Sequence, residues 1–511
     1  MIARINSVGL SGIQGQCIQV ETDVSPGLPS WEIVGLPDAA VRESKERIRS
    51  AVKQAGFSIP GKRIVVSLAP ADMKKEGACL DLPIALGILI STGQLPAQAA
   101  ENAVFLGELS LDGRLRPICG ALPMVITAYQ NGIKRVFLPA ANAREAAVVK
   151  EAEVYGAESL KELAEHLTGQ RQLGPCTVDV DALLRQAARS GPDFAEVKGQ
   201  QNAKRAIEVA AAGGHNLLLI GPPGSGKTML AQRIPSILPD LRFEEALEVT
   251  KVHSIAGKLP RDLPMVLTRP FRSPHHTVSA VGLTGGGSTP RPGEISLAHH
   301  GVLFLDELPE FHKQTLEILR QPLEDGMVTI TRASGTYSYP CNIMLVASMN
   351  PCPCGYYGDA DHRCSCSPMQ IKRYLSRISG PLLDRIDLQI EVRAVPYEEL
   401  EQASAAAESS AVIKKRVDAA RLLQNKRYQG SGIYSNARLT PAMMEECCRL
   451  KPDGAALLKD AYERLGLSAR AHNRILKVAR TIADLDGSRW IEAPHLAEAI
   501  QYRSLDRKFW T

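Results

Sequence analysis

The chain has 511 residues, of which 44% are hydrophobic, 23% are charged and only 5% are aromatic. This composition excludes a disordered or fibrous chain and argues against a nucleic-acid platform built from many stacked aromatic side chains. The formal net charge of +5 permits nucleic-acid binding through local patches, but it is too small for a protein that coats nucleic acid along a whole face.

The sequence shows no sign of secretion or membrane insertion. Its first segment, MIARINSVGLSGIQGQ, lacks an apolar stretch behind Arg4, and the longest apolar run, LPIALGILI, is about half of the roughly 20 residues that a membrane-spanning helix requires. The 11 cysteines are odd in number and scattered, which argues against a secreted disulfide framework. We therefore expect a soluble, cytoplasmic protein with no membrane partner.

At roughly 100–200 residues per domain, the length predicts about three domains. Residues 1–168 alternate short apolar strands, such as RIVVSLAP, with helical patterns such as PDAAVRESKERIRSAVKQAG, and predict an α/β domain. Asp112 and Gly113 predict a hairpin turn of type I′, whose two central residues both need a positive φ. Residues 169–193 are polar and predict a linker with one short helix at VDVDALLRQAA.

Residues 194–395 show a second α/β pattern, which opens with the helix QNAKRAIEVAAAGG and the buried-type strand NLLLIGPP. After Pro396 the strand patterns end, so residues 396–511 predict a helical domain, in which Pro441 occupies the first turn of a helix. The predicted fold class is thus α/β for the first two domains, followed by a helical lid.

The segment GPPGSGKT follows an apolar strand and precedes a helix, which is the context of a P-loop. Its glycines let backbone N–H groups surround the phosphates of ATP at the start of a helix. Lys227 is placed to reach the β- and γ-phosphates, and the Thr228 hydroxyl is a ligand for Mg²⁺. The predicted nucleotide-binding residues are Gly221, Pro222, Pro223, Gly224, Ser225, Gly226, Lys227 and Thr228.

The strand GVLFLDEL delivers Asp306 and Glu307 at its C-terminal edge, where parallel α/β sheets bind ligands. Asp306 is predicted to hold Mg²⁺ through water, and Glu307 to orient and deprotonate the water that attacks ATP. An Asp-Glu pair after a strand is common by itself, so this prediction depends on the P-loop that precedes it.

Asn350 ends a further apolar strand, NIMLVASMN, where a polar side chain reaches the attacking water or the γ-phosphate. Here the chain resembles the AAA+ ATPases, in which such a residue is called sensor 1. In the magnesium-chelatase and MCM-helicase branch, the segment similar to GPLLDRIDL carries an arginine finger, which implies this role for Arg385. The helix LSARAHNRILKVART resembles the sensor 2 helix, which implies that Arg470 senses the nucleotide, with Arg474 as its rival.

For each of these arginines, the alternative interpretation is a solvated surface residue without a role in the nucleotide site. Because an arginine finger acts in the site of a neighbouring subunit, the resemblance also implies a ring, which we expect to be a homohexamer.

The segment PFRSPHHTVSAVGLTGGGSTPRPGEISLAHHGVLFLDELPEF nearly reproduces the magnesium-chelatase-like signature. With the N-terminal region, it resembles the ComM/YifB family of competence-associated AAA+ proteins over essentially the whole chain. This resemblance implies an ATP-hydrolysing, hexameric DNA helicase that promotes branch migration in homologous recombination during natural transformation. It also implies an N-terminal α/β domain of the Lon-protease (S5) type, a central AAA+ P-loop domain and a C-terminal helical lid.

Two segments offer a route from ATP hydrolysis to DNA. The resemblance places the Gly-rich segment 273–292 as an insert that projects into the ring pore, and MVTITRASGTYSYP is predicted to form a hairpin with its turn near Ser334 and Gly335. Arg291 and Arg332 are the candidate phosphate contacts, although either is equally compatible with a surface cation.

The adjacent histidine pairs His275/His276 and His299/His300 suggest a metal site only weakly. We expect the side chains of neighbouring residues to diverge, which leaves such a pair unable to hold one ion together.

The segments LAPADMKKEGACLDLPIAL and FLGELSLDGRLRPICGALPMV resemble the proteolytic domain of Lon, which uses a Ser-Lys dyad. Position by position, the serine falls on Cys79 and the lysine on Leu122. A thiolate is a nucleophile, but Leu122 can neither take its proton nor lower its pKa. We therefore expect no peptidase activity and interpret this domain as a platform for oligomerisation or DNA contact.

The segment NPCPCGYYGDADHRCSCSP contains four cysteines just after Asn350. The pairs Cys352/Cys354 and Cys364/Cys366 have a one-residue gap, which departs from the usual spacing of structural zinc ligands. Four thiols in a reducing compartment still favour one closed Zn²⁺ site, with His362 as a substitute ligand. The alternatives to a zinc site in this insert, which spans residues 351–367, are unligated cysteines and a redox-active cluster.

Two other functions compete with the DNA helicase. One is the ATPase subunit of a metal-chelatase-like complex, and the other is an AAA+ assembly factor that remodels proteins. Stimulation of ATP hydrolysis by DNA distinguishes the helicase from both.

Overall fold

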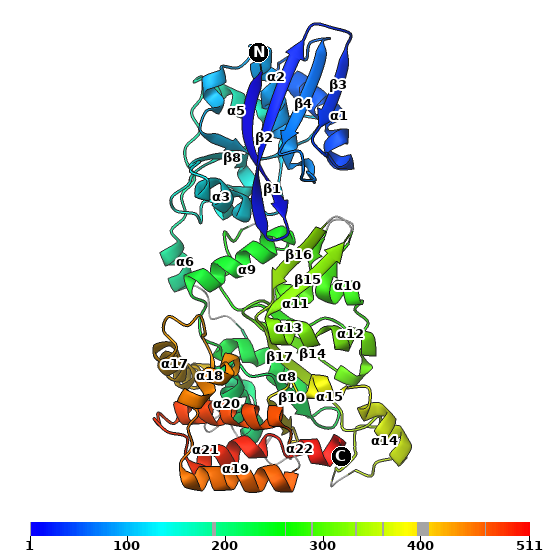
Figure 1. Ribbon diagram of the computed structural model, residues 1–511, viewed down its shortest axis with the longest axis vertical. Coiled ribbons are helices and arrows are strands. Elements are labelled where there is room, and N and C mark those ends of the chain that lie inside the picture. Colours follow the sequence, from blue (N-terminus) through cyan, green and yellow to red (C-terminus); the bar gives the residue numbers. More distant parts are fainter. Residues whose placement is uncertain are drawn as a thin grey trace.

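The computed structural model describes residues 2–186, 191–260, 262–287, 290–332, 335–359, 362–395, 408–465 and 467–510. The molecule is elongated, with the N-terminal α/β region at one end, the P-loop region in the middle and the C-terminal helices at the other end (Figure 1). The predicted α/β fold class with a helical C-terminal region is confirmed. The residue boundaries between the domains remain predictions.

The N-terminal region contains a seven-stranded mixed sheet in the order β3-β4-β2-β1-β5-β8-β9. In β4, Ile64, Val66 and Leu68 are buried and alternate with less buried residues, as expected for a strand with one face on a core. The strands are β1 (Ala3–Ser11), β2 (Gln14–Ser25), β3 (Ser30–Val34), β4 (Arg63–Ala69), β5 (Ala103–Phe105), β8 (Arg135–Pro139) and β9 (Glu153–Ala157).

Helices pack against this sheet and complete its core. They are α1 (Ala39–Gln54), α2 (Asp81–Ser91), α3 (Ala121–Gln130), α4 (Ala140–Ala146) and α5 (Leu160–Leu167). The apolar run LPIALGILI lies in α2 and is buried on every side, which explains its hydrophobicity. No helix among the described residues is long and apolar enough to cross a membrane.

The hairpin predicted at Asp112 and Gly113 exists, but the predicted turn type is wrong. The strands β6 (Glu108–Leu109) and β7 (Leu115–Arg116) pair antiparallel across a longer loop. Only Gly113 has a positive φ, of 83°, because the Asp112 carboxylate accepts the backbone N–H of Arg114 at 3.1 Å and holds the loop in another conformation.

The segment predicted as a linker contains the expected short helix, α6 (Val180–Gln186). Before this helix, Cys176 forms an isolated bridge with Val154 of β9, and Leu173 and Val178 pack on the N-terminal core. The first part of the predicted linker therefore belongs structurally to the N-terminal region.

The central region contains a five-stranded parallel sheet in the order β11-β14-β17-β10-β18. Its strands are β10 (Leu217–Ile220), β11 (Phe271–Arg272), β14 (Val302–Leu305), β17 (Met344–Met349) and β18 (Leu388–Glu391). Every residue of β10, β14 and β17 is buried, which is why these strands are continuously apolar in the sequence.

The helices of the central region are α7 (Gln201–Gly213), α8 (Lys227–Arg233), α9 (Phe243–Ile255), α10 (Ala280–Thr284), α11 (Glu294–Leu297), α12 (Lys313–Ile318), α13 (Arg320–Asp325), α14 (Pro368–Leu375) and α15 (Gly380–Leu383). Two short antiparallel hairpins project from it: β12 (Gly285–Gly286) with β13 (Arg291–Pro292), and β15 (Met327–Arg332) with β16 (Gly335–Pro340). The predicted second hairpin is thus confirmed, although Ser334 lies outside the described residues.

The described residues beyond 395 form helices, as predicted, and Pro441 begins one of them. These helices are α17 (Ser410–Arg427), α18 (Pro441–Cys447), α19 (Pro452–Leu465), α20 (Ala469–Leu485), α21 (Ala493–Gln501) and α22 (Leu505–Trp510). The lid core and the P-loop sheet share one cluster of buried apolar residues.

Helix α9 lies between the N-terminal and central regions (Figure 1) and contacts both. Near its C-terminal end, Ser254 donates a hydrogen bond to the buried Glu145 of α4, and its carbonyl accepts the N–H of Gly120 at 3.1 Å. On the other side of the junction, Ile13 in the β1–β2 turn packs in the same apolar cluster as Tyr337 of β16. The N-terminal region therefore contacts both α9 and the β15–β16 hairpin.

Asp484 is the centre of a buried network in the lid, where its side chain is 0% exposed. Its carboxylate accepts hydrogen bonds from Arg427 at 2.9 Å, from Asn436 at 2.9 Å and from Arg480 at 3.1 Å. Because both guanidinium groups are partly or fully buried, this carboxylate supplies the countercharge that keeps the helices together.

The substitution Asp484→Asn should lower the free energy of unfolding by about 3–5 kcal/mol, because it leaves the buried guanidinium of Arg480 and the partly buried one of Arg427 without countercharge. The matched control is Asp460→Asn, which breaks an exposed pair with Arg464 at 2.7 Å and should cost less than about 1 kcal/mol. Urea unfolding followed by circular dichroism measures both changes. Equal losses in the two variants would contradict this account.

Candidate functional site

The P-loop connects the buried strand β10 to helix α8, as the sequence predicts. Gly224 and Gly226 have positive φ values of 76° and 88°, a conformation that glycine adopts without steric cost. The Lys227 ammonium donates hydrogen bonds to the carbonyl oxygens of Gly221 and Pro222, each at 2.8 Å. The loop therefore closes around the lysine that is expected to contact phosphates.

Asn350 lies against the P-loop, because β17 and β10 are neighbours in the parallel sheet. Its side-chain oxygen accepts a hydrogen bond from Lys227 at 3.2 Å. Burial lowers the pKa of Lys227, although the carboxylates of Asp306 and Glu307 oppose this effect. The structure thus brings the predicted sensor 1 residue to the P-loop lysine.

Thr228, in the first turn of α8, lies next to Asp306, which follows β14, although β17 separates β14 from β10 in the sheet. The Thr228 hydroxyl donates a hydrogen bond to Asp306 at 2.8 Å. A hydroxyl and a carboxylate are hard oxygen donors, and this donor set suits Mg²⁺. The two predicted magnesium ligands therefore lie side by side next to the P-loop.

Glu307 follows Asp306 with a φ of 53°, an uncommon value for a residue other than glycine. Its side chain is 58% exposed. His276 approaches it, with 3.6 Å between Nδ1 and the carboxylate, which is an ion pair only when the histidine is protonated. The carboxylate is thus accessible to a water molecule.

Sequence reasoning missed two residues of this site. Ser348 of β17 is buried, donates to the carboxylate of Asp306, and lies near the backbone N–H of Glu307. Gln200, the N-cap residue of α7, donates to the carbonyl of Ser225 at 3.2 Å and so anchors the P-loop. Ser348 was within reach of sequence reasoning, since it precedes Asn350 by two positions on one strand.

Arg385 does not lie in the P-loop site of its own chain. Its side chain is 8% exposed, and it donates to the carbonyl of Arg320 at 3.0 Å and to the carboxylate of Glu324. To act as an arginine finger, Arg385 would therefore have to leave these acceptors and contact a nucleotide phosphate in the site of a neighbouring subunit.

The two candidates for sensor 2 differ in their surroundings. Arg470 is exposed in the first turn of α20. Arg474 is 18% exposed and lies 3.6 Å from the carboxylate of Asp387, which follows the Arg385 segment. Arg470 is thus the more exposed of the two side chains, whereas Arg474 connects the lid to Asp387, the residue before β18.

The two candidate DNA contacts lie close to each other although 41 positions separate them in the chain (332 − 291). Arg291 pairs with Gly286 across the β12–β13 hairpin, and the guanidinium of Arg332 lies so close that a Cβ on Gly286 would be 3.2 Å from it. Both arginines are exposed. Two hairpins thus present their cations on one patch.

The expectation that neighbouring histidine side chains diverge is wrong, because the ring centroids of His299 and His300 lie 4.0 Å apart. Both His299 and His300 reach one oxygen of Glu248, at 3.1 and 2.8 Å. Nδ1 of His299 accepts the backbone N–H of Asn342, so its Nε2 carries the hydrogen in the neutral ring. Burial lowers the pKa of His299 to about 4, which keeps the ring neutral. Because that Nε2–H donates to Glu248, the group is a hydrogen-bonded cluster and not a vacant ligand set.

The remnant of the Lon dyad is apolar and closed. Cys79 is buried, and burial raises the pKa of its thiol to about 12, so it carries no thiolate near neutral pH. Leu122 is fully buried in an apolar cluster that also includes Leu241 and Met265 of the central region. In this protein the position of the Lon lysine therefore serves packing between regions.

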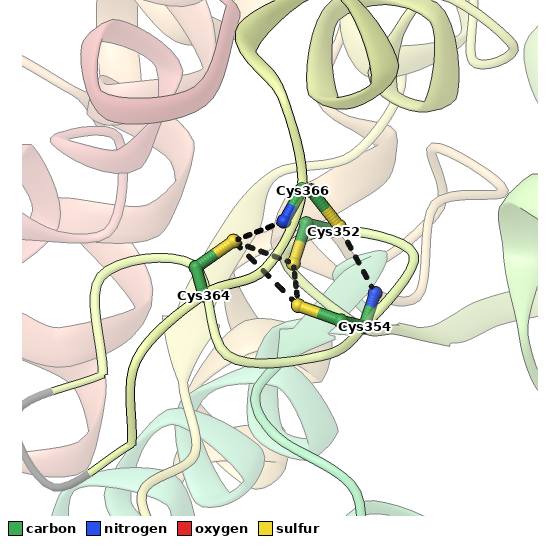
Figure 2. A group of neighbouring side chains, drawn as sticks. All are labelled: Cys352, Cys354, Cys364 and Cys366. Carbon is green, nitrogen blue, oxygen red and sulfur yellow. Dashed lines mark hydrogen bonds between the residues drawn. The ribbon is translucent and has the colours of Figure 1, made fainter.

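The four cysteines of the insert converge (Figure 2), whereas His362 is not part of the group. The Sγ of Cys352 lies 3.3 Å from that of Cys354 and 3.7 Å from that of Cys364. Four sulfurs around one tetrahedral Zn²⁺, each about 2.3 Å from the ion, would be about 3.8 Å apart. Cys366 completes the group, so the residues present fit a structural zinc ion.

The cysteine loop also touches the P-loop. Gly355 has a φ of 89°, and a Cβ on it would lie 2.4 Å from Cδ of Pro223. Only glycine fits there, so the insert supports the nucleotide site directly.

Comparison with known families matches three segments of the chain. Residues 193–400 match the family described as "Magnesium chelatase, subunit ChlI", and residues 20–142 match "Subunit ChlI of Mg-chelatase". Residues 407–503 match "Magnesium chelatase, subunit ChlI C-terminal".

Individual relatives extend this similarity over the full length. The chain is 43% identical over 507 residues to the protein "Competence protein ComM" of Haemophilus influenzae, which covers 99% of this chain and 98% of that protein. It is 44% identical over 498 residues to the protein YifB of Escherichia coli, covering 97% and 96% of the two chains. It is also 26% identical over 147 residues to the Lon protease of Mesomycoplasma hyopneumoniae, covering 28% and 17% of the two chains. The chain therefore belongs to the magnesium-chelatase-like AAA+ ATPases of the ComM/YifB family.

Proposed function

We propose that the protein is an ATP-driven, ring-forming DNA translocase that promotes branch migration during homologous recombination in natural transformation. The observation that carries this proposal is the patch formed by Arg291 and Arg332, because both hairpins belong to the same fold unit as the P-loop. The name of the H. influenzae relative, a competence protein, supports the same process.

Hydrolysis is assigned to side chains at one edge of the central sheet. Lys227 and the backbone of the P-loop hold the phosphates, while Thr228 and Asp306 hold Mg²⁺, which neutralises phosphate charge when bound. Glu307 orients a water molecule and takes its proton, since its carboxylate is exposed beside this site. Asn350, which already contacts Lys227, reports the state of the nucleotide to β17.

Chain connectivity explains how hydrolysis reaches the DNA. In the chain, the β15–β16 hairpin lies between β14, which Asp306 follows, and β17, which Asn350 follows. A shift of either strand end on loss of the γ-phosphate therefore displaces the hairpin that presents Arg332. We propose that this displacement moves the DNA strand along the pore of a homohexamer, in which Arg385 completes the neighbour's site.

A second function has a specific observation in its favour, since all three matched families are named for a magnesium chelatase subunit. In that case the protein would drive metal insertion by partner proteins, and DNA would not change its ATP turnover. If the protein were instead an assembly factor that remodels proteins, DNA would also leave its ATP turnover unchanged.

The cysteine group is assigned a structural Zn²⁺, bound by Cys352, Cys354, Cys364 and Cys366. Its closed set of four thiols leaves no open position for a reacting ligand. Because Gly355 in the same loop packs on Pro223, the ion would also stabilise the P-loop.

The substitutions Lys227→Ala and Glu307→Gln should separate nucleotide binding from hydrolysis. Lys227→Ala should abolish both, whereas Glu307→Gln should keep ATP binding and lower the hydrolysis rate by about 10²- to 10⁴-fold. Fluorescent-nucleotide titration and phosphate release measure the two steps, with the exposed Lys258→Ala as the control. Normal turnover in Glu307→Gln would refute the assignment of the general base.

Single-stranded or branched DNA should raise the ATP hydrolysis rate of the wild-type protein. The double variant Arg291→Ala/Arg332→Ala should lose this stimulation, keep its basal rate, and lower the salt slope of single-strand binding by about 1.4, since each phosphate contact contributes roughly 0.7. Replacing the exposed Arg114 and Arg449 instead should change neither quantity. If neither single-stranded nor branched DNA changes the ATP hydrolysis rate of the wild-type protein, the translocase proposal fails. A chelatase subunit or an assembly factor would then be favoured.

The purified protein should contain one Zn²⁺ per chain, measured by plasma emission spectrometry. Cys352→Ser/Cys364→Ser should lose the ion and bind ATP more weakly, whereas the exposed Cys17→Ser should retain both properties. Gly355→Ala should keep the zinc yet lower the free energy of unfolding by about 1–3 kcal/mol and weaken ATP binding, because its added methyl group clashes with Pro223. Wild-type protein without zinc would contradict the assignment.

A further inference from the structure

A pocket of about 570 Å³ opens on the N-terminal region at the outer edge of its sheet. It is formed by β3, the C-terminal part of α1, and the segment that leads into β4. This volume falls in the range of roughly 300–1,000 Å³ that is typical of ligand sites. None of the site residues described above lines it.

The side chains of the pocket combine aromatic surface with positive charge. Trp31 and Phe57 contribute partly buried rings, and Arg49, Lys53 and Lys62 contribute three cations. No carboxylate lines the pocket. Outside the pocket, Arg49 pairs with Glu46 at 3.1 Å on the exposed surface.

The aromatic wall is held in place before any ligand binds. Trp31 lies in β3 opposite Ile64 of β4, and its carbonyl accepts a hydrogen bond from Lys45. The loop that carries Phe57 is fixed by Gln94, which accepts the N–H of Ser58 at 2.9 Å and donates to its carbonyl at 2.8 Å. A preformed site loses little conformational entropy on binding.

We propose that this pocket binds a nucleotide unit of single-stranded DNA, with the base against Trp31 and the adjoining phosphates at Lys53 and Lys62. Stacking on aromatic rings beside a cationic groove is how proteins hold single strands without reading their sequence. The inference rests on the proposed function, because it assumes that a DNA strand passes the ring.

The position of the pocket indicates what this contact does. It lies at the end of β2 opposite to the β1–β2 turn, whose Ile13 contacts the β15–β16 hairpin of the motor. At about 3.4 Å per residue, β2 separates the two ends by roughly 40 Å. The pocket therefore holds the strand well away from the motor, where it would prevent slippage between cycles of ATP hydrolysis.

The test uses the full chain and a fluorescein-labelled oligo-dT strand, with affinity measured by anisotropy over a series of salt concentrations. Lys53→Ala/Lys62→Ala should weaken binding and lower the salt slope by about 1.4. Trp31→Ala should weaken binding by about 10-fold, and Trp31→Phe should recover most of this loss, because stacking tolerates another ring. Basal ATP hydrolysis should stay at the wild-type rate in all three variants.

Lys134→Ala/Lys161→Ala, which removes two exposed lysines elsewhere on the same domain, is the matched control and should bind like the wild type. If the Arg291→Ala/Arg332→Ala protein loses DNA while the pocket variants do not, the proposed function stands and the pocket proposal is overturned. If the pocket variants change only the oligomeric state, the pocket is a contact between subunits and the proposal is equally overturned. If the wild-type protein binds no DNA, this result contradicts both the proposed function and the pocket proposal.

Discussion

The structure depends on the arrangement of three buried parallel strands whose carboxyl ends meet at one edge of the central sheet. Because β17 lies between β10 and β14, residues that are far apart in the chain become neighbours there. The hydrogen bond from Thr228 to Asp306 joins the P-loop to β14, and the bond from Lys227 to Asn350 joins it to β17. Both contacts lie at the edge where the proposed function places the phosphates of ATP.

Helix α9 connects the central region to the N-terminal region. Its Glu248 holds His299 and His300, which directly precede β14, and its Ser254 contacts Glu145 in the N-terminal core. The helix is thus hydrogen-bonded to both regions. The Lon-like region, which has lost its dyad, is therefore placed to respond to events at the nucleotide site.

The sequence was sufficient for features that depend on local chemistry. The P-loop, the strand ends at Asp306 and Asn350, and the start of a helix at Pro441 follow from glycine, apolar and proline patterns over a few residues. The four cysteines were also grouped correctly, although their spacing departs from common zinc sites. In these cases the residues that interact are close in sequence or lie at equivalent ends of adjacent strands.

Features that depend on distant packing escaped prediction. The contact of Gly355 with Pro223 joins segments that the sequence gives no reason to pair. The convergence of His299 and His300 on Glu248 depends on the placement of α9, and their side chains were expected to diverge. At Asp112, a side-chain hydrogen bond selected a loop that the Asp-Gly pattern does not indicate. The proposed role of Arg385 depends on a second subunit, because in its own chain the side chain donates to Arg320 and Glu324.

The central claim is that ATP hydrolysis at this sheet edge moves DNA. The most direct measurement is the release of a labelled strand from a branched DNA substrate by the purified protein with ATP, with the Glu307→Gln protein assayed in parallel. The account predicts release by the wild-type protein and none by the variant, which still binds nucleotide. Hydrolysis of ATP by the wild-type protein without strand release would contradict it.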